Sequence, residues 1–260
     1  MRTYLAAARS SFRRQSTYRA ATVAGIFTNV VFGFILASVL LAVFRTRPAV
    51  GALDATRAVT FTFVAQGLLI VMGTFGWREV ADRIVTGDIA VDLYRPVSFS
   101  AWWASVWLGR TAFALLARGV PPFLAGALVF HLRLPTRLVT WPAFMLAILV
   151  GTLVASRFWL LVNMVAFWLL DIRGALSLAI VAVSVASGFA VPLQFIGGWF
   201  GALCRWSPFA TFAQYPIEVF LELRAPWRAY GAALAWLVVL ELGVRVALRA
   251  AVHKVVLQGG

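Results

Sequence analysis

Charged residues inside long apolar runs are the part of this sequence whose chemistry needs an explanation. Glu241 and Arg245 interrupt the last apolar run, and a spacing of four residues places them on one face of a helix, where they can pair. A charge at the centre of a bilayer costs at least ~2.5–3.5 kcal/mol, so such groups pair with one another or line a functional path. A structural ion pair and a contact with substrate are therefore the two interpretations of Glu241 and Arg245.

Three further arginines raise the same question. Arg110 and Arg118 lie about two helical turns apart in one apolar run, and Arg157 lies in the next. Such residues are expected to face protein, lipid headgroups or a water-filled path, and a guanidinium suits an anionic lipid or an anionic substrate. Contact with a subunit or headgroup and contact with substrate remain the alternatives.

The sequence lacks the motifs of a self-contained enzyme. Its only lysine, Lys254, is followed by Val255, so no P-loop of the form G-x-x-x-x-G-K-[ST] exists. His131 and His253 are expected at opposite faces of a membrane and cannot share a metal, and Cys204 is the only cysteine. Because Glu241 is the only acid expected at bilayer depth, an aspartyl pair is excluded too. We expect no catalytic, cofactor-binding or metal site in this chain.

The amino-acid composition indicates that lipid, and not water, surrounds most of the protein. Of the 260 residues, 62% are hydrophobic and only 12% are charged, whereas a soluble domain carries about 25% charged residues. The net charge of +14 could indicate a nucleic-acid partner. The arginines lie mostly between apolar runs, however, which is typical of membrane flanks. We therefore expect an integral membrane protein whose partners include membrane lipids and no nucleic acid.

The apolar runs predict an all-α protein with a single transmembrane domain over residues 1–260. Residues 1–20 place Leu5, Ala8 and Phe12 on one side of a helix and arginines on the other, which predicts a helix lying in the membrane interface. Six transmembrane helices are expected to follow. They cover about 21–44, 58–76, 101–130, 139–170, the stretch from the turn at 171–174 to about 191, and 228–250.

Two segments between these helices cannot be ordinary spans. Residues 77–100 hold several acidic and basic residues and must protrude or lie at a surface. Residues 192–216 are apolar but rich in glycine and proline, which predicts a re-entrant hairpin. The pair Pro121–Pro122 predicts a kink in the third helix. The cluster Trp102, Trp103 and Trp107 is interpreted as an interface anchor.

Basic residues before the first helix set the predicted orientation. They favour cytoplasmic N- and C-termini by the positive-inside rule. Residues 77–100 then face the cytoplasm, and residues 192–216 face outward. The basic residues are Arg2, Arg9, Arg13, Arg14 and Arg19.

Two stretches carry a resemblance to a known family. Residues 84–96 read IVTGDIAVDLYRP, which is similar to the pattern G-x-[IL]-x-x-x-L-x-x-P found after the second helix of ABC-2-type permeases. The sequences VPLQFI at 191–196 and WSPF at 206–209 resemble the proline-marked region after helix 5 of the same family. The resemblance covers nearly the whole chain, and the order of its features is more specific than either motif.

The resemblance implies a permease subunit of a bacterial ABC exporter in the cell membrane. It implies a partner ATPase subunit that binds ATP and Mg, and a second permease chain, identical or paralogous. Helices 1, 2 and 5 would line the substrate path, with residues 192–216 as an outer gate. Residues 77–100 would be the ATPase-coupling segment, in which Ile84, Ile89 and Leu93 enter a cleft of the ATPase. The implied coupling residues are Ile84, Gly87, Asp88, Ile89, Asp92, Leu93 and Pro96.

Other interpretations stay open. Residues 77–100 can also be a solvated amphipathic loop without a partner. The whole chain can be an ion-coupled secondary transporter, whose transport would persist without ATP hydrolysis and collapse with the proton gradient. A membrane enzyme or scaffold would produce no flux at all.

Overall fold

The computed structural model describes residues 1–71, 73, 77–169 and 171–258, with side chains described as far as Ala251. Within these ranges the chain is helical and forms no strand; a single bridge joins Val50 to Leu53. Most helices form where the sequence has long apolar runs. Their bounds are α1 Arg2–Ser16, α2 Arg19–Thr46, α3 Ala55–Leu68, α4 Glu79–Val85, α5 Ile89–Tyr94, α6 Phe99–Ala114, the π-helical turn η1 Leu115–Gly119, α7 Val120–Val129, α8 Thr140–Met164, the 3₁₀ turn η2 Val165–Phe167, α9 Arg173–Ala186, α10 Gly198–Trp206, the 3₁₀ turn η3 Pro208–Thr211, α11 Gln214–Phe220 and α12 Pro226–Gln258.

Four helical stretches are long and apolar enough to cross a membrane: Arg19–Thr46, Phe99–Val129, Thr140–Phe167 and Pro226–Ala251. They correspond to the first, third, fourth and sixth predicted spans. The other two predicted spans are represented by α3 and α9, each 14 residues long and shorter than the ~20 residues of a full crossing. Part of the end of predicted helix 58–76 lies outside the described residues. The predicted continuation of α9 to residue 191 is wrong, because Gly188, with φ +81°, ends the helix in the left-handed region.

The third span is continuous but irregular where the kink was predicted. Pro121 and Pro122 stand in the first turn of α7, and η1 separates them from α6. A proline ring crowds the preceding turn and supplies no N–H, and a π-helical turn accommodates this by widening the helix locally.

In the segment 192–216, two of the prolines lie in the first turn of a helix. Pro208 is the first residue of η3, and Pro216 lies in the first turn of α11, where a missing N–H costs nothing. Helix α11 is buried throughout, whereas α10 exposes Trp199, Leu203 and Trp206. Because α11 continues to Phe220, the helical segment extends beyond the predicted boundary at 216.

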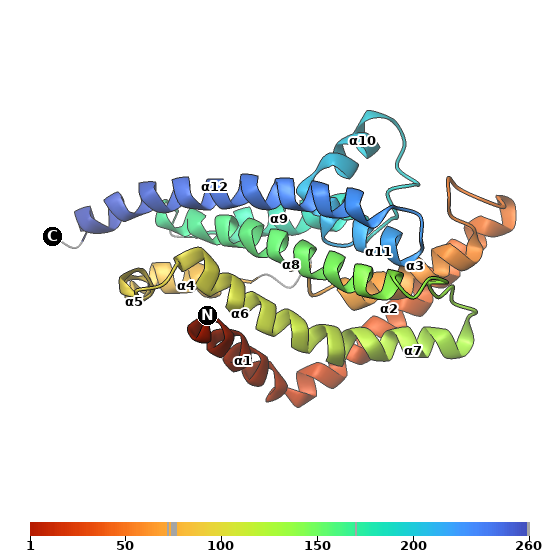
Figure 1. Cartoon of the computed structure of the whole chain (residues 1–260), viewed down its shortest axis with the longest axis horizontal. Coiled ribbons are helices and arrows are strands. Elements are labelled where there is room, and N and C mark those ends of the chain that lie inside the picture. Colours follow the sequence, from red (N-terminus) through yellow and green to blue (C-terminus); the bar gives the residue numbers. More distant parts are fainter. Residues whose placement is uncertain (72, 74–76, 170, 259–260) are drawn as a thin grey trace.

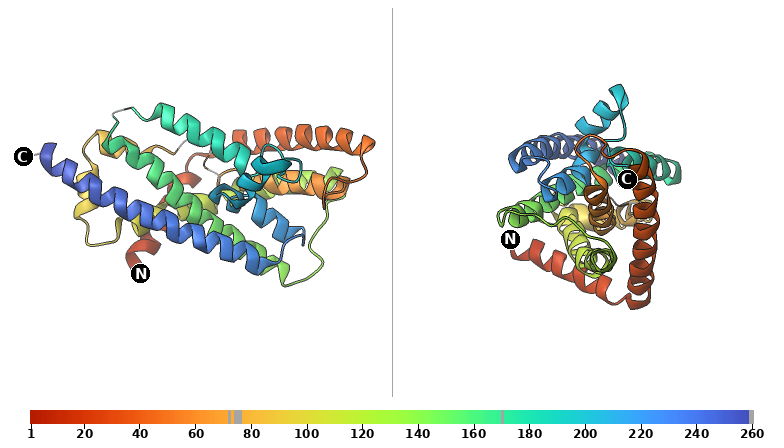
Figure 2. Two further views of the ribbon diagram at one scale, coloured as in Figure 1. Left: turned by 90° about the horizontal axis from the view of Figure 1, so that it is seen from above. Right: turned by 90° about the vertical axis from the view of Figure 1, so that its right-hand side faces the viewer.

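The long helices run beside one another along the longest axis of the molecule (Figure 1). Helices α4 and α5 and the C-terminal end of α12 lie at one end, and the connection between α2 and α3 lies at the other; both views agree (Figures 1 and 2). Helix α1 packs along α6 so closely that a Cβ on Gly109 would lie 1.9 Å from the carbonyl oxygen of Ala8. Leu5, on the predicted apolar side of α1, is exposed, which agrees with a helix that lies in the membrane interface.

Candidate functional site

The segment predicted to couple the chain to a partner forms two short helices. Gly87, with φ +82°, separates α4 from α5 and adopts a conformation that other residues disfavour. Asp88 follows in the turn, where its carboxylate accepts a 2.9 Å hydrogen bond from Thr86 Oγ1. Pro96 follows α5, and Arg95 before it is extended, as expected for a residue that precedes proline. The glycine and the proline thus define a compact α4–α5 hairpin.

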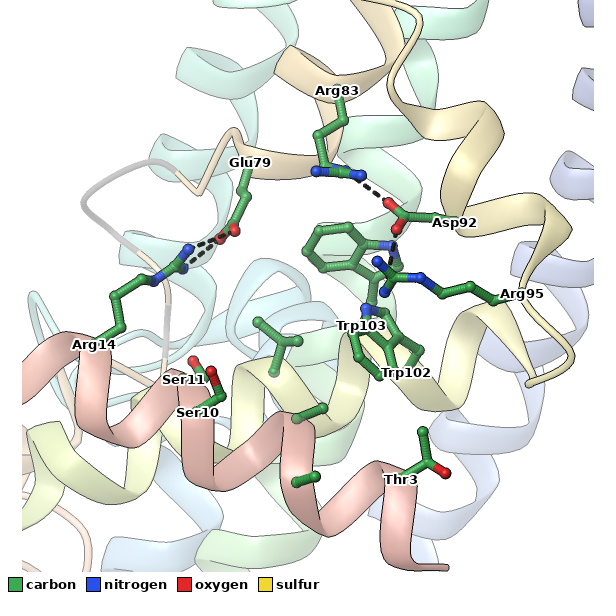
Figure 3. Close-up of a pocket in the computed structure, with 13 residues that line it drawn as sticks. Thr3, Ser10, Ser11, Arg14, Glu79, Arg83, Asp92, Arg95, Trp102 and Trp103 are labelled. Atoms are coloured by element: carbon green, nitrogen blue, oxygen red, sulfur yellow. Dashed lines mark hydrogen bonds and ion pairs between the residues drawn. The ribbon is translucent and has the colours of Figure 1, made fainter.

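Asp92 is the internal anchor of this hairpin. Its side chain is 2% exposed and bonds Arg83 Nε at 2.7 Å and Arg95 Nη1 at 3.4 Å. The guanidinium of Arg95 also lies over the Trp102 ring, 4.4 Å from its centroid. Figure 3 shows both arginines converging on the carboxylate. A buried carboxylate needs such partners, so Asp92 fixes the hairpin's shape rather than facing a partner protein.

A second ion pair joins the hairpin to the N-terminal helix. Arg14 on α1 donates two parallel hydrogen bonds of 2.8 Å to Glu79, the first residue of α4 (Figure 3). Burial favours the neutral acid, but the bonds from Arg14 outweigh it and hold the pKa of Glu79 below its ordinary value. The same hydrogen bonds raise the pKa of Arg14. The pair spans 65 residues of sequence and therefore links α1 to α4.

A cavity of about 410 Å³ lies between α1, the α4–α5 hairpin and α6. Figure 3 shows both ion pairs on its wall. The side chains of Ser11 and Trp103 on its lining are buried, and neither Ser11 Oγ nor Trp103 Nε1 has a hydrogen-bond partner among the described residues. The lining residues are Thr3, Ala6, Ala7, Ser10, Ser11, Arg14, Glu79, Arg83, Asp92, Arg95, Trp102, Trp103 and Val106.

The start of α4 is fastened to the membrane-spanning helices. Asn163 on α8 donates a 2.7 Å hydrogen bond to the carbonyl of Trp77 and accepts one of 3.0 Å from the amide of Ala81. Trp77 packs edge-on against Trp103 and Trp107 of α6, with centroids 5.6 and 4.9 Å away. The interpretation of Trp103 and Trp107 as interface anchors is wrong, because both are buried against this tryptophan. Helices α4, α6 and α8 thus meet in one rigid junction.

The exposed face of the hairpin differs from the expected one. Ile89 is 2% exposed and belongs to the core, and Ile84 and Leu93 pack partly against that core. The expectation that Ile89 enters a partner is corrected, because burial within the chain leaves it unavailable. For the half-buried Ile84 and Leu93 the expectation stays a prediction. The apolar side chains that the hairpin exposes are Val85, Val91 and Tyr94, exposed by 53%, 58% and 89%.

Comparison with models of protein families shows to which family the chain is related. The family model described as ABC-2 family transporter protein matches residues 39–259, most of the chain. The chain belongs to the ABC-2 transporter family. Searches among curated proteins and among solved structures returned no match.

In this ABC-2-type permease the predicted pair of Glu241 and Arg245 is present at 3.0 Å. Glu241 also receives hydrogen bonds from two other helices: Arg157 Nε on α8 at 2.8 Å and Ser100 Oγ on α6 at 2.6 Å. One carboxylate therefore joins α6, α8 and α12. The sequence singled out Arg157 as a charged residue in a span but gave no reason to pair it with Glu241, 84 positions away.

Arg110 and Arg118 do not pair with the carboxylate of Glu241. Neither forms an ion pair with a carboxylate within 4.0 Å in the part of the chain that the structure describes. Arg118 Nη2 instead donates a 2.8 Å hydrogen bond to the carbonyl of Ala21 on α2. Arg110 lies beyond ion-pair distance of Glu79 but attracts it electrostatically, whereas Arg118 forms no ion pair among the described residues.

Besides Asp92 and the partly buried Glu241, the permease holds a buried acid that the sequence analysis missed. Glu218 on α11 is 8% exposed; its Oε1 accepts hydrogen bonds from Gln214 at 2.7 Å and from Gln194 at 3.0 Å, and its Oε2 binds Arg224. Arg224 also stacks over the Tyr215 ring, 4.0 Å from the centroid. The expectation of a single buried acid is therefore wrong. The spacing of four between Gln214 and Glu218 was the available signal.

Proposed function

We propose that this permease is the membrane subunit of an ABC exporter driven by a separate ATPase that docks on the α4–α5 hairpin. The observation that carries the proposal is the hairpin's combination of a protruding apolar face with rigid attachment. Val85, Val91 and Tyr94 are exposed at the end of the molecule where the hairpin lies, which suits insertion into a groove of another protein (Figure 1).

Rigid attachment gives the docked ATPase a way to move the membrane helices. A push on α4 passes to α8 through Asn163, to α6 through Trp77 and to α1 through the pair of Arg14 and Glu79. Packed elements of this kind move as bodies instead of deforming. We propose that ATP and Mg bind to the partner subunit and that closure of the ATPase pair displaces these helices together.

The proposed topology has six crossings with cytoplasmic N- and C-termini in a bacterial cell membrane. In it α3 and α9 cross together with the residues that follow them, and α10 with α11 forms a re-entrant hairpin at the outer side. The location of the α4–α5 hairpin at the same end as the C-terminal end of α12 supports a common cytoplasmic side (Figure 2). A second permease chain, identical or paralogous, completes the path. The direction of transport follows from the resemblance to bacterial exporters.

The test is purification of the tagged chain with whatever binds to it, comparing wild type with the double variant Val91→Asp/Tyr94→Asp. A stoichiometric subunit with a P-loop is expected with wild type and not with the variant. The matched control is Leu138→Asp, because Leu138 is as exposed as Tyr94, at 89%, but lies outside the hairpin. It should retain the ATPase.

Recovery of the permease alone, even after crosslinking in intact membranes, would reject the coupled mechanism. Substrate flux that persists without ATP hydrolysis and stops when the proton gradient is dissipated would indicate an ion-coupled carrier. Undiminished ATPase recovery with Val91→Asp/Tyr94→Asp would show that the partner binds elsewhere.

A further inference from the structure

A small cavity, lined mostly by apolar surface but with several polar side chains, lies between α2, α3 and the π-helical turn η1, within the membrane-spanning part of the chain. Its volume is about 100 Å³. That is enough for one small polar group and too little for a whole lipid. The lining residues are Gly25, Thr28, Asn29, Gln66, Gly67, Leu69, Ile70, Ala114 and Arg118.

Arg118 supplies a positive charge to this cavity. One of its N–H groups is used by the carbonyl of Ala21, and no described carboxylate lies within ion-pair distance. A guanidinium carries five N–H donors in a planar fork that fits phosphate or carboxylate oxygens. Gly25 makes the room for it, since a Cβ there would lie 2.8 Å from Arg118 Nε. An uncompensated cation in a span calls for an anionic partner.

The side-chain amide of Gln66 adds a hydrogen-bond donor to the same wall. Gln66 is 2% exposed, and its Nε2 has no hydrogen-bond partner among the described residues. Asn29 is 6% exposed, and its Nδ2 already donates to two backbone carbonyls, that of Gln66 at 3.3 Å and that of Arg118 at 3.4 Å. Buried donors are normally satisfied. A ligand that offers several acceptor oxygens would satisfy Gln66 Nε2 and neutralise Arg118.

The backbone around the cavity is closely packed. Gly67 of α3 and Gly119 of η1 approach until a Cβ on Gly119 would lie 3.2 Å from the Cα of Gly67. This contact fixes α3 against the π-helical turn, a feature that often occurs at functional sites. The donors are therefore held on a rigid frame.

We propose that this cavity binds a phosphate group, through Arg118 and Gln66. The group can be carried by an anionic lipid of the surrounding bilayer or exist as a free ion; the charge and the donors recognise the same oxygens in either case. The proposal does not depend on the ATPase partner.

The experiment uses the full-length chain, with any subunits that copurify, in phosphatidylcholine nanodiscs with or without phosphatidylglycerol. Native mass spectrometry counts retained phosphatidylglycerol, and thermal unfolding follows its effect on the midpoint. Arg118→Gln is expected to lose one retained lipid per chain and to weaken the apparent affinity about tenfold, as loss of a charged hydrogen bond implies. Arg118→Lys should lose less affinity, because the positive charge remains although the planar fork of the guanidinium is absent.

Gly25→Val tests the same site without removing the charge, because its side chain would displace the guanidinium. It decides the question should Arg118→Gln fail to fold. The matched control is Arg133→Gln, which removes an exposed arginine of the loop after α7 and should leave lipid retention unchanged.

Inorganic phosphate added to phosphatidylcholine nanodiscs distinguishes the two sources. A midpoint that rises only with phosphatidylglycerol assigns the site to a lipid, and one that rises with phosphate alone assigns it to a free ion. Equal lipid retention and equal phosphate response in wild type, Arg118→Gln and Gly25→Val would overturn the proposal. Recovery of an ATPase subunit is measured separately, so failure here leaves the proposed function untouched.

Discussion

The side-chain carbonyl of Asn163 on α8 accepts a 3.0 Å hydrogen bond from the backbone amide of Ala81 on α4. Asn163 also donates to the carbonyls of Trp77 and Trp159, so a fully buried side chain holds the start of the α4–α5 hairpin on a spanning helix. A buried asparagine with all its groups bonded specifies one arrangement of the two elements.

Asn163→Leu should therefore weaken both the fold and the coupling. The change leaves the Ala81 amide and the Trp77 carbonyl without their partner, which costs about 1–3 kcal/mol for a buried group left unsatisfied. We expect a lower thermal midpoint in detergent and a loss of substrate-stimulated ATPase activity in the assembled transporter. Thr152→Val is the control, because Thr152 is equally buried on α8 but bonds only Ile148 of its own helix. Equal effects of the two substitutions would refute a special role for Asn163.

The pair of Arg14 and Glu79 predicts a contribution to stability that depends on pH. The folded-state pKa of Glu79 lies below its ordinary value of 4.5, so the pair stabilises the fold at neutral pH. That contribution declines as the pH falls below about 4.5 and through the lower folded pKa, because the unfolded chain binds the proton first. The difference in thermal midpoint between wild type and Glu79→Gln should shrink over this range. A difference independent of pH would contradict the assignment.

A charge swap isolates the pair from the rest of the fold. The side chains are 49% and 31% exposed, so screening limits the coupling energy to about 1 kcal/mol or less. Arg14→Glu should destabilise the packing of α1, and Arg14→Glu/Glu79→Arg should restore part of the loss in a double-mutant cycle. Protease cleavage between α1 and α2 provides the measurement. Absence of rescue by the double variant would count against a direct pair.

The spans could be predicted because their determinants are local. Long apolar runs identify α2, the α6–α7 span, α8 and α12. The termini of short helices were harder to predict, because a proline that breaks a helix interior is tolerated in a first turn, where Pro208 and Pro216 lie. The family resemblance singled out Gly87 and Pro96 as coupling residues; in the structure they flank α5, and their role in coupling stays a prediction.

Residues distant in sequence could not be paired. Arg14 meets Glu79 across 65 positions and Arg157 meets Glu241 across 84, and nothing in a single sequence specifies either contact. The sequence also did not show which side chains of α5 face the core, because that depends on the residues that contact them. Ile89 and Asp92 carry an apolar and a charged side chain, yet both are buried, since Arg83 and Arg95 neutralise the carboxylate.

At Glu222, a strained backbone conformation and side-chain hydrogen bonds have opposite effects on stability. It has φ +58°, a left-handed conformation that costs a non-glycine residue about 1 kcal/mol. Its carboxylate accepts hydrogen bonds from Thr136 Oγ1 at 2.6 Å, the Arg137 amide at 3.0 Å and Thr140 Oγ1 at 2.9 Å. Glu222→Gly should lower the thermal midpoint, because losing these three bonds outweighs relief of the backbone. A higher midpoint would show that the backbone term dominates.

The same carboxylate should titrate at unusually low pH. Its hydrogen bonds, led by that from Thr136, lower the pKa of Glu222 to about 2. The depressed pKa means that its contribution is complete at neutral pH, declines as the pH falls below about 4.5 and is lost near 2. Glu222→Gln retains an acceptor oxygen but no charge, so the stability gap to wild type should close over that window. A gap that closes at neutral pH would contradict the lowered pKa.

The three-helix junction at Glu241 predicts an unequal response of its two arginines. Arg157 is 13% exposed, and its removal leaves a partly buried carboxylate with fewer partners, at a cost of ~3 kcal/mol, the lower end of the range for breaking a buried pair. Arg245 is 65% exposed, so Arg245→Leu should cost less than about 1 kcal/mol. Chemical unfolding in micelles compares Arg157→Leu and Arg245→Leu, with Arg173→Leu in an exposed pair as the neutral control. If Arg157→Leu left stability intact but abolished flux, Glu241 and Arg157 would belong to the transport path instead of the junction.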